Sequence, residues 1–105
     1  MDEITPQALK ARLDASDRPV LLDVRDGWET KLCRLEHALH IPVEELDFRA
    51  EELDPADEIV VYCHHGVRSA AVADYLRQRG YRRVKNLAGG LDAWARSVEP
   101  TMRRY

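Results

Sequence analysis

VVYCHHGVRSAAVADYL (residues 60–76) joins two different structural patterns at one cysteine. The apolar run before the junction ends at Cys63 and has the length and the branched side chains of a buried strand. The residues from 67 to 80 follow a helical pattern instead, since Val72 and Leu76 lie one turn apart. A thiol between a strand and a helix can be a small buried side chain, a metal ligand, a redox partner or a nucleophile.

The same alternation of strand and helix runs through the rest of the chain. Thr5 is placed to cap a helix within residues 4–16, and Pro6 to begin it. Short apolar runs predict strands over 20–24, 38–42, 58–63 and 84–87. The stretches between them predict a polar turn over 25–29, and residues 88–98 predict a turn followed by a closing helix. Residues 43–53 are expected to form an acidic amphipathic helix with Val43 and Leu46 facing inward.

Strands that alternate with helices predict an α/β fold, with a central parallel sheet covered by helices on both faces. Ligands of such sheets bind beyond the carboxyl ends of the strands. Cys63 lies at such an end, directly before a helix. The sequence therefore places this thiol where a functional site is expected.

The composition favours one small domain. The chain has 105 residues, 45% of them hydrophobic, and we expect a single domain over residues 1–105 with a frayed tail over about 99–105. The net charge of −3 provides no global positive field to attract nucleic acid or an anionic membrane. No apolar run approaches the roughly 20 residues of a membrane span, and no secretory signal pattern is present, so a cytoplasmic protein is expected.

The turn after Cys63 has the features of an anion-binding loop. Gly66 allows the positive φ that a tight curl requires, and such a curl would direct backbone N–H groups toward the Cys63 sulfur. These groups and the N-terminus of the next helix favour the thiolate, which is the nucleophilic form. Arg68 offers a planar fork of donors for a sulfonate-, phosphate- or arsenate-like oxyanion. Cys63 is therefore a candidate nucleophile, and the substrate or its leaving group is expected to be anionic.

Other roles for the cysteine and the histidines have weaker support. Cys63, His64 and His65 are three potential metal ligands, but adjacent residues do not easily converge on one tetrahedral ion and the usual zinc spacings are absent, so no metal is expected. A redox pair of Cys63 with Cys33 lacks the C-x-x-C spacing. His64 and His65 can be solvated loop residues or acid–base groups, and the sequence leaves both roles open.

Three stretches together resemble the single-domain rhodanese, or thiosulfate sulfurtransferase-like, family. They are LLDVRDGWE (21–29), HIP (40–42) and VVYCHHGVRSAAVADYLRQRGYRRVKNLAGGLDAW (60–94), and the similarity covers about residues 4–98. The resemblance implies an α/β fold with a parallel sheet of about five strands. It also implies that Cys63 is catalytic: this residue would accept a sulfane sulfur as a persulfide from thiosulfate or a similar donor. A thiol, cyanide or a protein would then take the sulfur, with no cofactor.

The resemblance also assigns roles to the residues around Cys63. The substrate-binding residues would be those of the loop whose amides cradle the sulfur: His64, His65, Gly66, Val67 and Arg68. Asp23, Arg25 and Ser69 are expected to support the site. We expect Asp23 and Arg25 to form a structural ion pair or a hydrogen-bonded turn.

The length of the loop separates sulfur transfer from its nearest rivals. Four residues lie between Cys63 and Arg68, whereas the cysteine-dependent phosphatases and related arsenate reductases have five. The tighter ring suits one added sulfur atom better than a tetrahedral phosphoryl group. We therefore predict a sulfurtransferase. A low-turnover persulfide carrier, which docks a partner through an acidic surface, is the alternative from another functional class.

CRLEHALHIP (33–42) departs from the usual pattern of the family. Cys33 stands where many members have glycine, and Glu36 and His37 replace a Pro-Gly or Glu-Gly pair. The stretch is closer to rhodanese modules that are fused to adenylating enzymes of sulfur-carrier pathways, which indicates a protein partner. Cys33 itself is expected to be a buried thiol.

Overall fold

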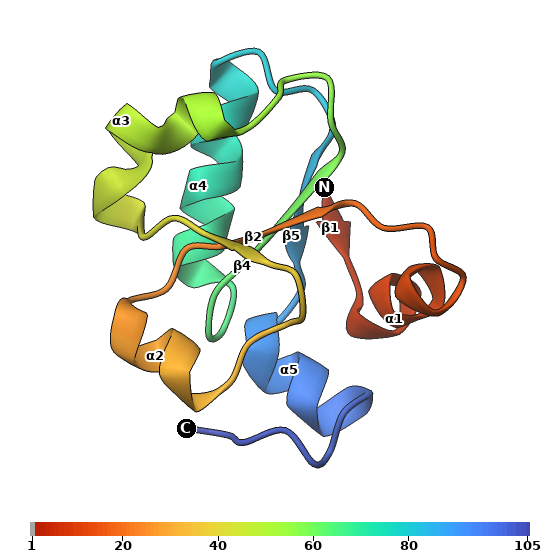
Figure 1. The fold of residues 1–105 in the computed structure, drawn as a ribbon. Helices are drawn as coiled ribbons and strands as arrows, with labels where there is room; N and C mark the ends of the chain where they lie inside the picture. The colour runs from red at the N-terminus through yellow and green to blue at the C-terminus, as the bar shows by residue number, and fades with distance from the viewer. Residues whose placement is uncertain (1) are drawn as a thin grey trace.

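The computed structural model describes residues 2–105, which form an α/β fold around one parallel β-sheet (Figure 1). Five strands pair in the order β1-β5-β4-β2-β3, and every pair is parallel. The strands are β1 (Glu3–Ile4), β2 (Val20–Asp23), β3 (Leu39–His40), β4 (Ile59–Tyr62) and β5 (Val84–Leu87). The predicted parallel sheet of about five strands is confirmed.

The register aligns the ends of β2, β3 and β4. Asp23, the last residue of β2, pairs with Tyr62 at the end of β4 and with His40 at the end of β3. The segments that follow these strands therefore emerge together at one edge of the sheet, and Cys63 is among them. This is the edge at which the sequence predicts a site.

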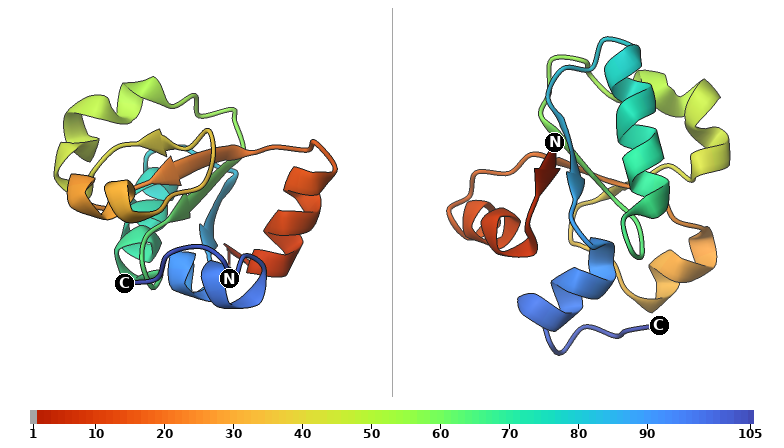
Figure 2. Two further views of the ribbon diagram at one scale, coloured as in Figure 1. Left: turned by 60° about the horizontal axis from the view of Figure 1, so that its bottom comes forward. Right: turned by 180° about the vertical axis from the view of Figure 1, so that it is seen from behind.

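Helices cover both faces of the sheet, as predicted. Figures 1 and 2 show α3 and α4 on one face and α1 and α5 on the other, with α2 near the edge that holds Cys63. The helices are α1 (Pro6–Asp14), α2 (Gly27–Leu32), α3 (Leu46–Arg49), α4 (Val67–Gln78) and α5 (Gly90–Ser97). Within residues 2–105, no helix is long and apolar enough to cross a membrane.

The side chains of β4, and of Cys63 directly after it, belong to the apolar cores on both faces of the sheet. Val61 and Cys63 join the cluster that includes the buried face of α4, whereas Val60 and Tyr62 join the cluster that includes α5 and the start of the chain. Successive residues of a strand point to opposite faces, so a central strand that is covered on both sides must be apolar throughout. This explains why β4 reads as a continuous apolar run.

Residues at two helix ends have the conformations or contacts that such ends require, and Thr5 and Pro6 take the places predicted for them. At the start of α1, the Thr5 hydroxyl accepts a hydrogen bond of 3.1 Å from the backbone N–H of Ala8, and Pro6 takes the first helical position. After α4, Gly80 has φ +96°, the left-handed conformation that commonly ends a helix.

The polar turn predicted over residues 25–29 is instead the start of a helix. Asp26 caps α2, and the Glu29 side chain reaches back to accept a hydrogen bond of 3.0 Å from the Asp26 backbone N–H. With only six residues, α2 is too short and too polar to show a helical period of apolar side chains. The capping pair of Asp26 and Glu29 was the available signal.

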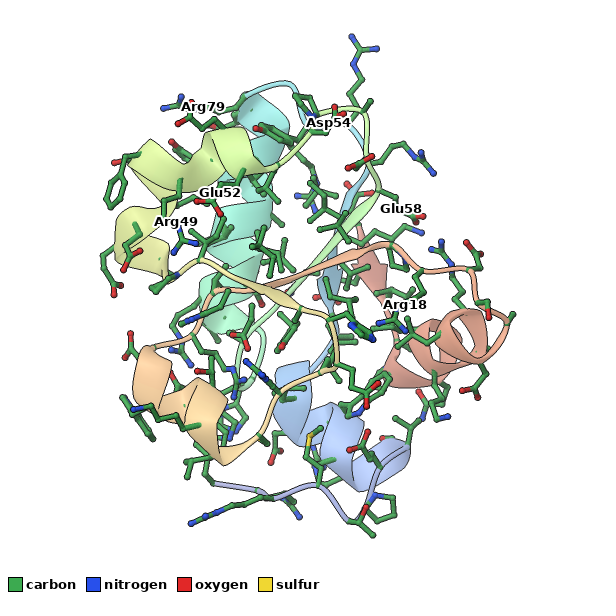
Figure 3. The ribbon with its side chains drawn as sticks, viewed as in Figure 1. Arg18, Arg49, Glu52, Asp54, Glu58 and Arg79 are labelled. Carbon is green, nitrogen blue, oxygen red and sulfur yellow. The ribbon has the colours of Figure 1, made fainter. Side chains whose placement is uncertain are left out.

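The helix predicted over residues 43–53 is broken into three short turns. They are a 3₁₀ turn at Val43–Glu45, α3 at Leu46–Arg49 and a second 3₁₀ turn at Ala50–Glu52. Leu46 faces inward as predicted, but Val43 is exposed, so that part of the prediction was wrong. The Tyr81 hydroxyl donates to the carbonyl oxygens of Ala50 and Leu53, at 3.0 and 3.3 Å, and so binds the end of the segment to the core. Outside, Arg49 pairs with Glu52 at 2.7 Å (Figure 3).

Candidate active site

Cys63 directly follows β4, and the loop after it encloses the Cys63 sulfur. The backbone N–H groups of Gly66 and Ser69 donate to Cys63 Sγ at 3.1 and 3.4 Å. The cysteine is almost fully buried, with 1% of its surface exposed. Two amides directed at one sulfur would stabilise negative charge on it, because each presents the positive end of a peptide dipole.

Glycines allow the loop to close this tightly. Gly66 has φ +99°, a conformation that other residues adopt only with strain. A side chain at Gly90, at the start of α5, would collide with the carbonyl oxygens of Cys63 and His64. Those two carbonyls accept hydrogen bonds from Leu91 N and Asp92 N at 2.9 and 3.0 Å. The N-terminus of α5 therefore holds the first half of the loop in place.

Asn86 of β5 holds the other half of the loop, and no local pattern in the sequence points to it. Its side-chain amide donates to the Gly66 carbonyl at 3.2 Å, and its oxygen accepts from the Ser69 hydroxyl. Ser69 Oγ also lies 3.3 Å from Cys63 Sγ. Because the single hydroxyl proton of Ser69 is directed at Asn86, Ser69 accepts from the thiol of Cys63 rather than donating to its sulfur.

Arg68 is paired with Glu29, which lies in the segment predicted to be a polar turn. Its guanidinium meets the carboxylate of Glu29 at both oxygens, at 2.6 and 2.9 Å. Glu29 is only 3% exposed. The hydrogen bonds from Arg68 lower the pKa of Glu29 to about 2, against the opposing effect of burial. Part of the Arg68 fork is therefore occupied, and the guanidinium is held in a fixed orientation.

Asp23 and Arg25 form a fully buried ion pair behind the site. Arg25 Nε and Nη2 donate to the two carboxylate oxygens of Asp23 at 3.0 and 2.7 Å, and Nη2 also donates to the Cys33 carbonyl at 2.7 Å. Arg25 has no exposed surface. The ion pair expected between the two residues is therefore present.

The loop residues predicted to bind substrate do not all face the sulfur. The Val67 side chain is 78% exposed, and His65 is exposed as well. Their side chains therefore point to solvent, so that any contact they make with a bound sulfur would come from the backbone. The backbone amides of Gly66 and Ser69 face the sulfur instead.

His64 and His65 lie against each other, with ring centroids 4.0 Å apart. Burial, and then the neighbouring His65, lower the pKa of His64. Among the described residues, the Nε2 atom of His64 is buried without a hydrogen-bond partner. Donor atoms of His64, His65 and Asp92 lie within 4.8 Å of one another, closer than expected for adjacent histidines. Both carboxylate oxygens of Asp92 already pair with arginines, Oδ1 with Arg104 at 3.2 Å and Oδ2 with Arg96 at 3.1 Å.

Cys33 is a free, half-buried thiol. It packs against the cluster on the α1 and α5 face, whereas Cys63 belongs to the cluster on the α4 face. The two thiols thus belong to opposite sides of the sheet, which disfavours the redox pair weighed from the sequence.

The end of the chain also reaches the site, in contrast to the frayed tail expected over residues 99–105. The Tyr105 hydroxyl accepts from Arg25 Nη1 at 2.9 Å and donates to Glu29 at 2.7 Å. These partners lie 80 and 76 residues earlier in the sequence. A single aromatic residue in a polar tail gives no periodic signal, so the sequence offered no means of finding this contact.

Known proteins match the chain over almost its whole length. A family model described as the rhodanese-like domain matches residues 5–97. A sulfurtransferase of Allochromatium vinosum is 36% identical over 100 residues, which are 95% of this chain and 94% of that protein. The thiosulfate sulfurtransferase GlpE of Glaesserella parasuis is 35% identical over 98 residues, which are 93% of this chain and 90% of that protein. The crystal structure of a rhodanese-related protein from Thermoplasma volcanium has a TM-score of 0.85 and 28% identity, covering 95% of this chain and 96% of that one.

Proposed function

Because the chain belongs to the rhodanese-like domain family, we propose that it is a sulfurtransferase that carries a sulfane sulfur on Cys63. The observation that carries the proposal is the pair of backbone amides, from Gly66 and Ser69, that donate to the Cys63 sulfur. A sulfur atom that gains and loses negative charge during transfer needs donors of this kind at a fixed position. The similarity to a thiosulfate sulfurtransferase supports thiosulfate as a donor.

In the first step, the Cys63 thiolate attacks the outer sulfur of the donor. With thiosulfate, a new S–S bond forms to Cys63, the S–S bond of the donor breaks, and sulfite leaves with the bonding electron pair. The loop amides stabilise the persulfide anion that results. The Arg68 donors that Glu29 does not occupy assist the departing oxyanion.

In the second step, a nucleophile removes the outer sulfur of the persulfide. The nucleophile attacks that sulfur, the S–S bond breaks, and Cys63 leaves as the thiolate that began the cycle. A thiol acceptor becomes a persulfide and cyanide becomes thiocyanate. Both steps need only the sulfur of Cys63, so no cofactor enters the scheme.

The surroundings of Cys63 also argue against phosphatase chemistry. Four residues separate Cys63 from Arg68, and the two amides already contact the bare sulfur. Arg68 is engaged with Glu29 at both carboxylate oxygens, which leaves a smaller set of donors than a tetrahedral phosphoryl group would need. One added sulfur atom fits this arrangement better.

Intact mass spectrometry after incubation with thiosulfate tests the proposal. We expect a gain of about 32 Da, the mass of one sulfur atom, that is lost on reduction with a thiol. The Cys63→Ser variant should gain nothing, whereas the matched Cys33→Ser variant should behave as the parent does. The absence of any mass gain from thiosulfate or from a persulfide donor would contradict the proposal. Turnover with cyanide or a dithiol then separates an enzyme from a slow carrier.

A further inference from the structure

The last residues of the chain run back across the side of the molecule on which Cys63 lies. After α5 the chain turns toward α2, as both Figure 1 and Figure 2 show. Met102 packs against the apolar cluster of the α1 and α5 face, and Arg104 pairs with Asp92 at 3.2 Å. These two contacts direct Tyr105 toward the loop that holds the cysteine.

Tyr105 is held by four different groups. Its hydroxyl accepts a hydrogen bond from Arg25 and donates one to Glu29. Its ring stacks on His64, with centroids 3.9 Å apart and an interplanar angle of 14°, and it meets the Trp28 ring edge-on at 5.9 Å. The hydroxyl is protonated at neutral pH, and burial raises the pKa of Tyr105 further above its ordinary value.

These contacts connect the two ends of the cysteine loop. His64, under the Tyr105 ring, directly follows Cys63, and Glu29 holds Arg68 at the far end of the same loop. Cys63 is 1% exposed and Glu29 is 3% exposed. A donor or acceptor must reach the sulfur of Cys63, so some covering group has to move before transfer can occur.

Of the groups packed on the cysteine loop, Tyr105 can move away at the lowest cost in free energy. The loop itself is fixed by backbone hydrogen bonds to α5 and by Asn86. Residues 103–105 are instead held by side chains, and the ion pair between Arg104 and Asp92 involves an arginine that is 54% exposed, so water screens it. Segments with few packed contacts open far more readily than core elements do.

We propose that Tyr105 controls access to Cys63 and so determines which sulfur donors and acceptors react with it. With the tail closed, the ring of Tyr105 covers the loop between His64 and Glu29. When the tail opens, the sulfur becomes reachable, and large reagents require a wider opening than small ones. The consequence for sulfur transfer rests on the function proposed above, but the control of access does not.

The rate at which Cys63 is alkylated tests the proposal directly. The rate is measured with iodoacetamide, a small neutral reagent, and with a maleimide on a polyethylene glycol chain, a bulky one. Peptide mass mapping counts the adduct at Cys63 apart from any at Cys33. The variants are Tyr105→Ala, which removes the cover, and Tyr105→Phe, which keeps the ring but not the hydroxyl. Tyr75→Phe is the matched control, since its hydroxyl binds Asp47 away from the site.

We expect Tyr105→Ala to raise the iodoacetamide rate about tenfold, because the rate follows the fraction of molecules that are open. The alkylation rate with the bulky maleimide should rise by a larger factor than the rate with iodoacetamide. The rates of Tyr105→Phe should lie between those of the parent and those of Tyr105→Ala. Tyr75→Phe and Arg103→Ala, a change at an exposed neighbour in the tail, should stay within about twofold of the parent, as changes away from the cover should. Thermal unfolding verifies that each variant is folded.

Equal alkylation rates in the parent and in Tyr105→Ala, with both reagents, would overturn the proposal. Alkylation needs no sulfur transfer, so this result is independent of the proposed function. A protein that takes no sulfur from any donor, but whose Cys63 is alkylated faster when Tyr105 is replaced, would contradict the proposed function. The same result would still support control of access by Tyr105.

Discussion

Glu29 and Arg68 set the charge that the site presents to a sulfur donor. A free arginine beside the cysteine would attract any anion, but here Glu29 compensates its charge through two hydrogen bonds. Arg25 is compensated in the same way by Asp23. We therefore expect Arg68 to orient donors through its remaining N–H groups more than to attract them from a distance.

The pairing of Glu29 should make stability depend on pH. The folded-state pKa of Glu29 is lowered to about 2, so its contribution is complete above its ordinary pKa and is lost as the pH falls toward 2. We expect the unfolding free energy of the parent to drop by about 2 kcal/mol more than that of Glu29→Gln between pH 5 and pH 2, after allowance for the solvent around Arg68. Urea unfolding at a series of pH values measures this difference.

Glu51→Gln is the matched control for this prediction, because Glu51 is an exposed carboxylate on the surface turn after α3. Its pH profile should run parallel to that of the parent. A Glu29→Gln profile that also runs parallel to the parent would mean that the pair with Arg68 adds nothing to stability.

At the scale of elements, the turn that begins α5 is the main support of the cysteine loop. Gly90 has φ +63° and lies against the carbonyl oxygens of Cys63 and His64. A close approach of two backbones requires glycine, since any side chain would separate them. The AGG sequence at 88–90 therefore supports the site through its backbone and not through side chains.

Gly90→Ala should destabilise the protein by about 2 kcal/mol or more, because it adds a collision to an unfavourable φ. Sulfur loading of Cys63 should slow as well, since the loop can no longer rest on α5. Thermal unfolding and the mass assay measure the two effects. Gly27→Ala is the control: a Cβ there meets nothing within 4 Å, and we expect a change between zero and about 1 kcal/mol of stabilisation. Equal stability of the two variants would contradict the role given to Gly90.

Elements that bury apolar side chains could be predicted from the sequence, and those held by polar contacts could not. β2 and β4 appear as apolar runs because both of their faces are covered, and α4 shows its buried residues at helical spacing. α2 is short and polar, and the 43–53 segment is shaped by bonds from Tyr81, 28 to 31 residues further on. The site divides in the same way. Cys63 and its loop follow from local sequence, whereas Glu29, Asn86 and Tyr105 reach the loop only through the fold.

At the scale of the whole molecule, the site depends on both cores at once. Cys63 belongs to the cluster on the α4 face, while α5, which supports its loop, packs into the other. The sheet between the clusters joins them through β4. We therefore expect the two halves to unfold together as one cooperative domain.

Leu76→Ala tests this cooperativity. Leu76 is fully buried on α4, and its truncation should cost about 2–5 kcal/mol. Trp94 lies on α5, in the opposite cluster, and its fluorescence is followed in a Trp28→Phe background so that it alone reports. The Trp94 transition and the far-UV circular dichroism transition should shift together. Gln78→Ala, an exposed change on the same helix, should shift neither. Two separate transitions would show that the faces unfold independently.

The hydrogen bonds from α5 to the loop also bear on how its amides respond to charge. The carbonyls of Cys63 and His64 are bound to Leu91 N and Asp92 N. In a trans peptide the carbonyl and the following N–H point in opposite directions, so the N–H groups of His64 and His65 are turned away from α5. These dipoles are thus oriented before any sulfur arrives. If Cys63 carries the persulfide proposed above, backbone groups that are already oriented need not rotate when charge appears on it, which keeps the reorganisation energy of the transfer small.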